Sequence, residues 1–183
     1  IGEVVLFESV DNEEAAVQWN CPIIVNGGNN WAFEVRLKVE NITDNRATCY
    51  AGLYVRAAEL SGDVVADNGA ALTAGDTLGF IRKEADGNAV DFIYGDSGAF
   101  VDHDAGYVVP AADTYLTLGM YYNGTTIQGY LNGVLSGTAI SASDIIDGDF
   151  PAAAILVPTL ANKGDNAADF DFSIDWIRVA QDA

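Results

Sequence analysis

Two Asn-Gly pairs that lie close together constrain the fold of this chain more than any other feature. Asn123-Gly124 and Asn132-Gly133 both lie between runs of strand-forming residues, within the stretch 114–138. Asn-Gly favours the two-residue type I′ hairpin turn, because both turn positions need a positive φ. The two pairs therefore predict an antiparallel meander, with strands at 115–122, 125–131 and 134–138.

Several segments alternate between apolar and polar residues with the period of two that is typical of a strand. The clearest is 31–40, in which Glu34, Arg36 and Lys38 alternate with apolar residues. We expect the apolar faces of three such strands to meet in one core. This predicted core consists of Trp31, Phe33, Leu116, Leu118, Phe170, Phe172, Ile174 and Trp176. Truncation of Trp176 to alanine is then expected to cost about 3–5 kcal/mol.

The same strand patterns recur along the whole chain, separated by turn signals, and no long helical pattern interrupts them. A chain of 183 residues, half of them hydrophobic, fits one domain over residues 1–183. No apolar run approaches the length of about 20 residues that a membrane span needs. The pattern predicts an all-β protein, an antiparallel β-sandwich.

These stretches also resemble known modules. The hairpin followed by Tyr130-x-Asn132-Gly133 is similar to the central hairpin of concanavalin-A-like, laminin-G-like jelly rolls. Together with GDTLGF at 75–80 and IDWIRVAQ at 174–181, it resembles jelly-roll structural proteins of tailed phages. The resemblance covers roughly residues 30–183. It implies a virion structural protein, a capsid decoration or accessory subunit on the virion exterior that binds capsid or tail subunits. Shell symmetry favours a homo-oligomer, a trimer above all.

The charge of the chain limits its partners. It has 27 acidic and 8 basic residues, a net charge of −19. Such a field repels phosphate backbones and anionic lipid, so neither nucleic acid nor a membrane surface is expected as a partner. If calcium binds, Asp96, Asp102 and Asp104 in the predicted loop 96–104 are the candidate ligands. We nevertheless expect that no metal or other cofactor is needed for folding.

The strand at 47–57 permits two interpretations of its second face. Tyr50 and Tyr54 share that face. They either pack under another layer or line an open face together with Tyr115 and Tyr121. Exposed aromatic rows bind sugar rings or protein partners. The open face is the basis of the alternative function, an extracellular carbohydrate-binding, lectin-like module.

Catalytic motifs are weak. Gly95-Asp96-Ser97-Gly98 spells the sequence around the nucleophile of chymotrypsin-like proteases, but the only histidine, His103, follows the serine. The Glu-x-Asp-x-x-Glu motif of concanavalin-A-like glycosidases is absent. We therefore expect no catalytic, cofactor-binding or metal-binding residues and a protein that is not an enzyme. Cys21 and Cys49 form either one disulfide or two free thiols.

Overall fold

The computed structural model describes residues 4–8, 13–40, 47–56, 63–67, 69, 71–84, 87–97, 99–152, 154–164 and 170–182. One sheet, here called sheet A, consists of β1 (Val4–Glu8), β4 (Trp31–Val39), β9 (Leu116–Tyr122), β10 (Ile127–Leu131), β11 (Val134–Ile140) and β13 (Phe170–Gln181). The other, sheet B, consists of β2 (Glu14–Gln18), β3 (Ile23–Ile24), β5 (Ala47–Val55), β6 (Thr77–Arg82), β7 (Val90–Asp96), β8 (Ala99–Val108) and β12 (Ile155–Gly164).

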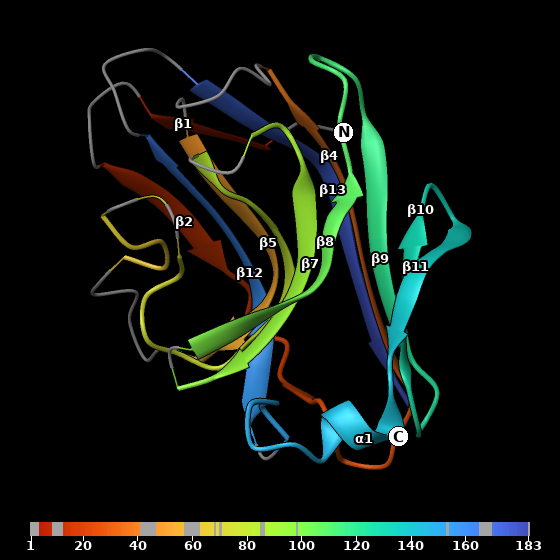
Figure 1. The fold of residues 1–183 in the computed structure, drawn as a ribbon. Coiled ribbons are helices and arrows are strands. Elements are labelled where there is room, and N and C mark those ends of the chain that lie inside the picture. Colours follow the sequence, from red (N-terminus) through yellow and green to blue (C-terminus); the bar gives the residue numbers. More distant parts are fainter. Residues whose placement is uncertain are drawn as a thin grey trace.

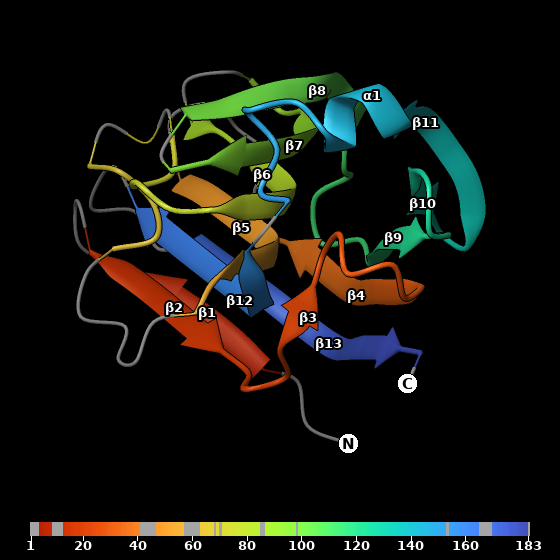
Figure 2. The same cartoon turned by 90° about the horizontal axis from the view of Figure 1, so that it is seen from below.

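The two sheets pack face to face (Figures 1 and 2), which confirms the predicted antiparallel sandwich. Sheet A has the order β1-β13-β4-β9-β10-β11. Sheet B has the order β2-β12-β5-β6-β7-β8, with β3 beside β12. The helix α1 (Ala142–Ile145) forms a single turn between β11 and β12. No helix in the described ranges is long and apolar enough to cross a membrane.

The second Asn-Gly pair makes the turn that the sequence predicts. Asn132 and Gly133 have φ values of 52° and 76°. They connect Leu131 directly to its pairing partner Val134, as a two-residue type I′ turn does. The carboxamide oxygen of Asn132 also accepts the backbone N–H of Thr117 at 2.9 Å. This bond ties the tip of the β10–β11 hairpin to β9.

The first Asn-Gly pair lies in a longer loop than predicted. Tyr122 pairs with Ile127, so residues 123–126 are all outside the ladder. The carboxamide oxygen of Asn123 accepts the backbone N–H groups of Thr125 and Thr126, both at 2.9 Å. Because this side chain satisfies the loop backbone, β10 begins at Ile127 and not at residue 125.

The core between the sheets contains most of the residues that alternation assigned to it. Six of the predicted core side chains are buried: Trp31, Phe33, Leu116, Leu118, Phe172 and Ile174. The side chain of Phe170 lies outside the described residues. Strand β4 alternates strictly between buried and half-buried positions, because one face packs on sheet B and the other faces outward.

The prediction for Trp176 is wrong because β13 contains a bulge. The register of β13 against β4 shifts between Ile174 and Trp176, and Trp176 lies opposite Arg36. The extra residue, Asp175, reverses the alternation, so side chains beyond it change face. The indole of Trp176 is half-buried on the outer face of sheet A, with the Arg178 guanidinium 4.2 Å from its ring centre.

Pro158 lies in an interior strand, although proline cannot donate to a ladder and is usually confined to edge strands and bulges. Strand β12 lies between β5 on one side and both β2 and β3 on the other. On that second side, pairing covers 159–163 with β2 and 155–156 with β3. Pro158 falls in the gap between them, where its carbonyl accepts the Trp19 N–H at 3.0 Å and no ladder residue needs an N–H from it.

Candidate functional site

The four tyrosines of the predicted open face lie on two different faces of the sandwich. Tyr50 and Tyr54 project from β5 on the outer side of sheet B and are only 0% and 6% exposed. Tyr121 projects from β9 on the outer side of sheet A, and Tyr115 precedes the same strand. The predicted common face is therefore not formed. For Tyr50 and Tyr54 the first interpretation, packing under another layer, is confirmed.

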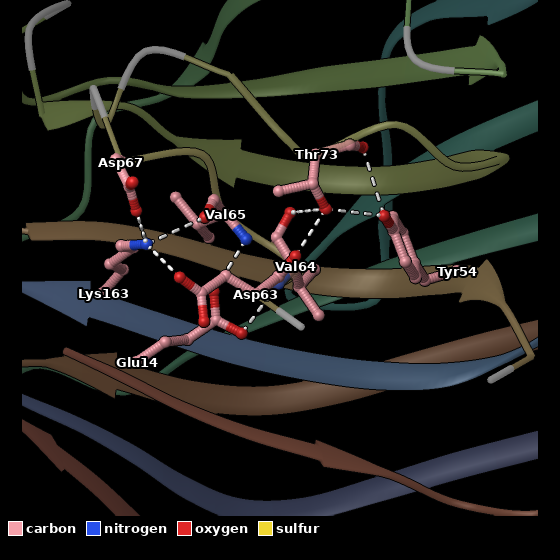
Figure 3. A network of polar contacts seen from close by, with 8 residues as sticks. All are labelled: Glu14, Tyr54, Asp63, Val64, Val65, Asp67, Thr73 and Lys163. Carbon is pink, nitrogen blue, oxygen red and sulfur yellow. Dashed lines mark hydrogen bonds and ion pairs between the residues drawn. The ribbon is translucent and has the colours of Figure 1, made fainter. Parts of the chain in front are cut away.

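That layer is a segment we call the strap, of which residues 63–67, 69 and 71–73 are described. It lies on the outer side of sheet B in both views (Figures 1 and 2, yellow). Val64, Val65 and Leu72 pack with the two tyrosines in a small hydrophobic cluster. The Tyr54 hydroxyl donates to the Thr73 carbonyl at 3.1 Å (Figure 3). The strap closes this part of sheet B to solvent.

Lys163, a buried cation in sheet B, binds the strap through ion pairs and a hydrogen bond. The ammonium group of Lys163, at the end of β12, pairs with Asp63 at 2.5 Å and Asp67 at 2.6 Å (Figure 3). It also donates to the Val65 carbonyl at 3.2 Å. Burial alone would lower the pKa of Lys163, but the two aspartates outweigh it and raise the pKa above its ordinary value. The lysine therefore stays charged.

Glu14, in β2, binds the strap beside Lys163 and makes the stability of the fold depend on pH. Its carboxylate accepts the backbone N–H groups of Val64 and Val65 at 2.8 and 2.7 Å. Burial raises the pKa of Glu14, and these two bonds oppose that effect only in part. A carboxyl with a higher pKa in the folded state adds stability as the pH falls through that pKa towards the ordinary value of 4.5.

We therefore expect wild-type protein to gain free energy of unfolding relative to Glu14→Gln as the pH is lowered from about 7 to about 4.5. The variant cannot titrate at this position, while the remaining groups are common to both proteins. Urea denaturation of both proteins at the two pH values measures the free energy of unfolding of wild type minus that of the variant. A difference that becomes less favourable to wild type as the pH is lowered contradicts the assignment.

The three aspartates of the predicted calcium loop do not converge. Strand β8 begins at Ala99, so most of the predicted loop is strand. Asp102 accepts the Lys83 ammonium at 3.0 and 3.1 Å, and Asp104 accepts the Thr138 N–H at 2.9 Å. Asp96 lies at the end of β7. Among the described residues, no three His, Cys, Asp or Glu side chains are placed to hold one metal ion.

The GDSG sequence and the cysteines are also placed by the structure. Ser97 lies in a turn with φ 55°, and its hydroxyl bonds to Asp96. The His103 ring instead contacts the Thr138 carbonyl at 3.2 Å. Cys21 and Cys49 are free thiols, and burial raises the pKa of Cys49 to about 12.

The outer face of sheet A remains accessible and is hollowed between aromatic rings. On the neighbouring strands β4, β9 and β10, Gly119 lies opposite both Glu34 and Tyr130, and Ala32 lies opposite Tyr121. Because Gly119 and Ala32 project little or nothing, the larger neighbours stand around a depression of about 250 Å³. Its walls are Tyr121, Tyr130 and Glu34. We call it the central hollow.

A second depression, the end hollow, adjoins the first where β4 begins and β13 ends. It has a volume of about 140 Å³ and is lined by Asn30, Ala32, Tyr121, Gln181 and Asp182, among others. The Asn30 amide donates to the Asp182 carboxylate at 3.0 Å, which fixes both at the rim. Ala32 and Tyr121 line both hollows. Tyr121, 37% exposed, thus stands between them.

Three cations lie elsewhere on the same face, each against an aromatic ring. Arg36 and Lys38 lie over Tyr115, at 4.3 and 5.6 Å from the ring centre, and Arg178 lies over Trp176. Each cation also pairs with a carboxylate: Asp175, Asp113 and Glu34 respectively. Each of these cations therefore has both an aromatic and an acidic partner within the protein.

Sequence reasoning named Tyr121 and missed the other walls of the hollows. The alternation of Gln128 and Tyr130 within 127–131 is a signal that could have placed Tyr130 beside Tyr121. The depression itself depends on Ala32 and Gly119 being neighbours, which only the strand order reveals. The rim residues Asn30 and Asp182 meet across more than 150 positions of the chain, and no local pattern brings them together.

No protein-family model and no curated protein sequence matches the chain. Solved structures do match it. The carbohydrate recognition domain of Emp46p, in a metal-free form, aligns with a TM-score of 0.65 and 7% identity, covering 97% of this chain and 87% of that one. A glycoside hydrolase family protein from Mycobacterium thermorestibile aligns with a TM-score of 0.65 and 15% identity, covering 98% of this chain and 76% of that one. β-Agarase A in complex with oligoagarose aligns with a TM-score of 0.58 and 13% identity, covering 92% of this chain and 67% of that one.

These comparisons overturn one expectation and leave another without support. The prediction that the protein is not an enzyme is overturned, since structures similar to it include a glycoside hydrolase family protein, the Crh5 transglycosylase and β-agarase A. Nothing among the comparisons links the chain to phages. At such low identities the likeness extends to the fold alone. The fold is the concanavalin-A-like jelly-roll sandwich that the resemblance implied.

Proposed function

We propose that this protein binds carbohydrate on the outer face of sheet A, and that it does so outside the cell. The observation that carries the proposal is the pair of hollows on the two sides of Tyr121. A sugar ring presents C–H groups on its faces and hydroxyls around its edge. Tyrosine combines an apolar ring with a polar tip, and a binding site needs a few polar groups to fix orientation. Tyr121 and Tyr130 supply the rings; Glu34, Asn30 and Asp182 supply the polar groups.

Two further observations support this proposal over the virion role expected from the sequence. Similar solved structures include a carbohydrate recognition domain and a β-agarase with bound oligoagarose. The capsid or tail partner and the trimer, in contrast, rest on the sequence resemblance alone. We therefore propose carbohydrate binding in place of a virion role.

Filling the central hollow tests the proposal. A Cβ added at Gly119 meets only ordinary contacts, the nearest being the Phe33 carbonyl oxygen and Tyr130 Cβ at 3.5 Å. Gly119→Leu should therefore fold normally and occupy the space meant for a sugar. Gly148→Leu is the matched control, since its position is surrounded by open space and lines neither hollow.

The two variants and wild type are compared by electrophoresis through gels that contain single polysaccharides. We expect at least one polysaccharide to retard wild type and Gly148→Leu equally, and Gly119→Leu to bind it at least about tenfold more weakly, a loss of about 1.4 kcal/mol. Thermal melting shows whether all three are folded. Equal retardation of Gly119→Leu would mean that the hollow is not the site.

A further inference from the structure

The charges that line the two hollows all have the same sign. Among the residues that surround them, the charged ones are Glu34 in the central hollow and Asp182 in the end hollow. An ionised carboxylate can only accept hydrogen bonds, through two oxygens. It binds a hydroxyl group well, because charge-assisted bonds are the stronger class. It repels a carboxylate or sulfate group on a ligand.

Of the cations on the same face, only Arg178 reaches a charge that lines a hollow. Its guanidinium lies 3.7 Å from the Glu34 carboxylate, and because the Arg178 side chain is 70% exposed, solvent screens the pair and it offsets that charge only in part. Arg36, Lys38 and Arg178 line neither hollow. Each is held against an aromatic ring and a carboxylate of the protein itself. An acidic ligand would need to break these pairs to use the cations. The net charge of −19 adds a general repulsion, which acts over about 10 Å at 0.1 M salt.

The shape of the face bears on the length of the ligand. The two hollows share Ala32 and Tyr121, so they form one continuous depression divided by a ring. It extends from the end of β13, across β4 and β9, to Gly133 in the β10–β11 turn. Each hollow is smaller than the roughly 300–1,000 Å³ of a typical pocket for a drug-sized ligand. One sugar unit in each hollow fits this division.

We infer that the ligand of this face is an uncharged polysaccharide, with two neighbouring sugar units placed on the two sides of Tyr121. This inference rests on the proposed function and narrows its ligand class. The carboxylates of Glu34 and Asp182 accept sugar hydroxyls, and the Tyr121 ring packs between the two units.

The test uses the purified chain of residues 1–183 and two groups of polysaccharides. The neutral group is β-glucan, xylan, galactan, mannan and agarose; the acidic group is polygalacturonate, alginate and carrageenan. We expect binding to be confined to the neutral group, with an affinity that changes less than about threefold between low and high salt, because no ion pair forms. From the bound polysaccharide, a disaccharide should bind at least about tenfold more tightly than the monosaccharide.

Variants distinguish a failure of this inference from a failure of the proposed function. Glu34→Gln combined with Asp182→Asn should weaken neutral binding and reduce the exclusion of the acidic group. Binding of acidic polysaccharides to wild type that is lost in Tyr121→Ala would overturn the inference and leave the proposed function intact. Equal affinity for monosaccharide and disaccharide would overturn the two-unit placement. If no member of either group binds, both the inference and the proposed function are wrong.

Discussion

Replacing Trp31 with alanine should lower the free energy of unfolding by about 3–5 kcal/mol. The same change at Trp176 should cost only about 1 kcal/mol. Trp31 is 1% exposed in the core, stacks on Tyr122 with ring centres 6.0 Å apart, and donates its indole N–H to the Val25 carbonyl at 3.1 Å. Its truncation leaves a cavity and an unpaired carbonyl. Trp176 is half-buried on the outer face and loses mainly its contact with Arg178.

Guanidinium denaturation of wild type and the two variants measures this difference. Trp31→Ala is the reference for a true core truncation, which makes the comparison independent of the absolute stability. If Trp176→Ala costs as much as Trp31→Ala, β13 has no bulge at Asp175, and the alternation read from the sequence continues to the end of the strand.

The sheets themselves were predictable because their signals are local. Strict alternation in β4 and the Asn132-Gly133 turn each follow from a few neighbouring residues, and both are present in the structure. One local signal was incomplete. Asn123 closes its loop with its own side chain, a preference of asparagine that the type I′ assignment did not take into account.

The faces were less predictable because they depend on strand order. Alternation shows that Tyr54 and Tyr121 point away from their strands' core faces, but not that β5 and β9 belong to different sheets. The bulge at Asp175 has no distinctive residue such as glycine or proline. The strap is held through Lys163 and Asp63, which are 100 positions apart. Long-range contacts of this kind leave no pattern in a single sequence.

Truncating Tyr121 should reduce the affinity for the bound polysaccharide about 10- to 100-fold without unfolding the protein. Tyr121 lines both hollows and is partly exposed, so its ring is available to a ligand and contributes little to the core. Tyr115→Ala is the matched control. It removes the same side chain next to the same strand and on the same face, but Tyr115 lies beneath Arg36 and lines neither hollow.

Calorimetric titration of wild type, Tyr121→Ala and Tyr115→Ala with the oligosaccharide of the bound polysaccharide tests the carbohydrate site most directly. We expect wild type and Tyr115→Ala to agree within about threefold, and Tyr121→Ala to fall at least about tenfold below them, with all three melting at the same temperature. Unchanged affinity in Tyr121→Ala, or an equal loss in both variants, would contradict a binding site in the hollows on either side of Tyr121.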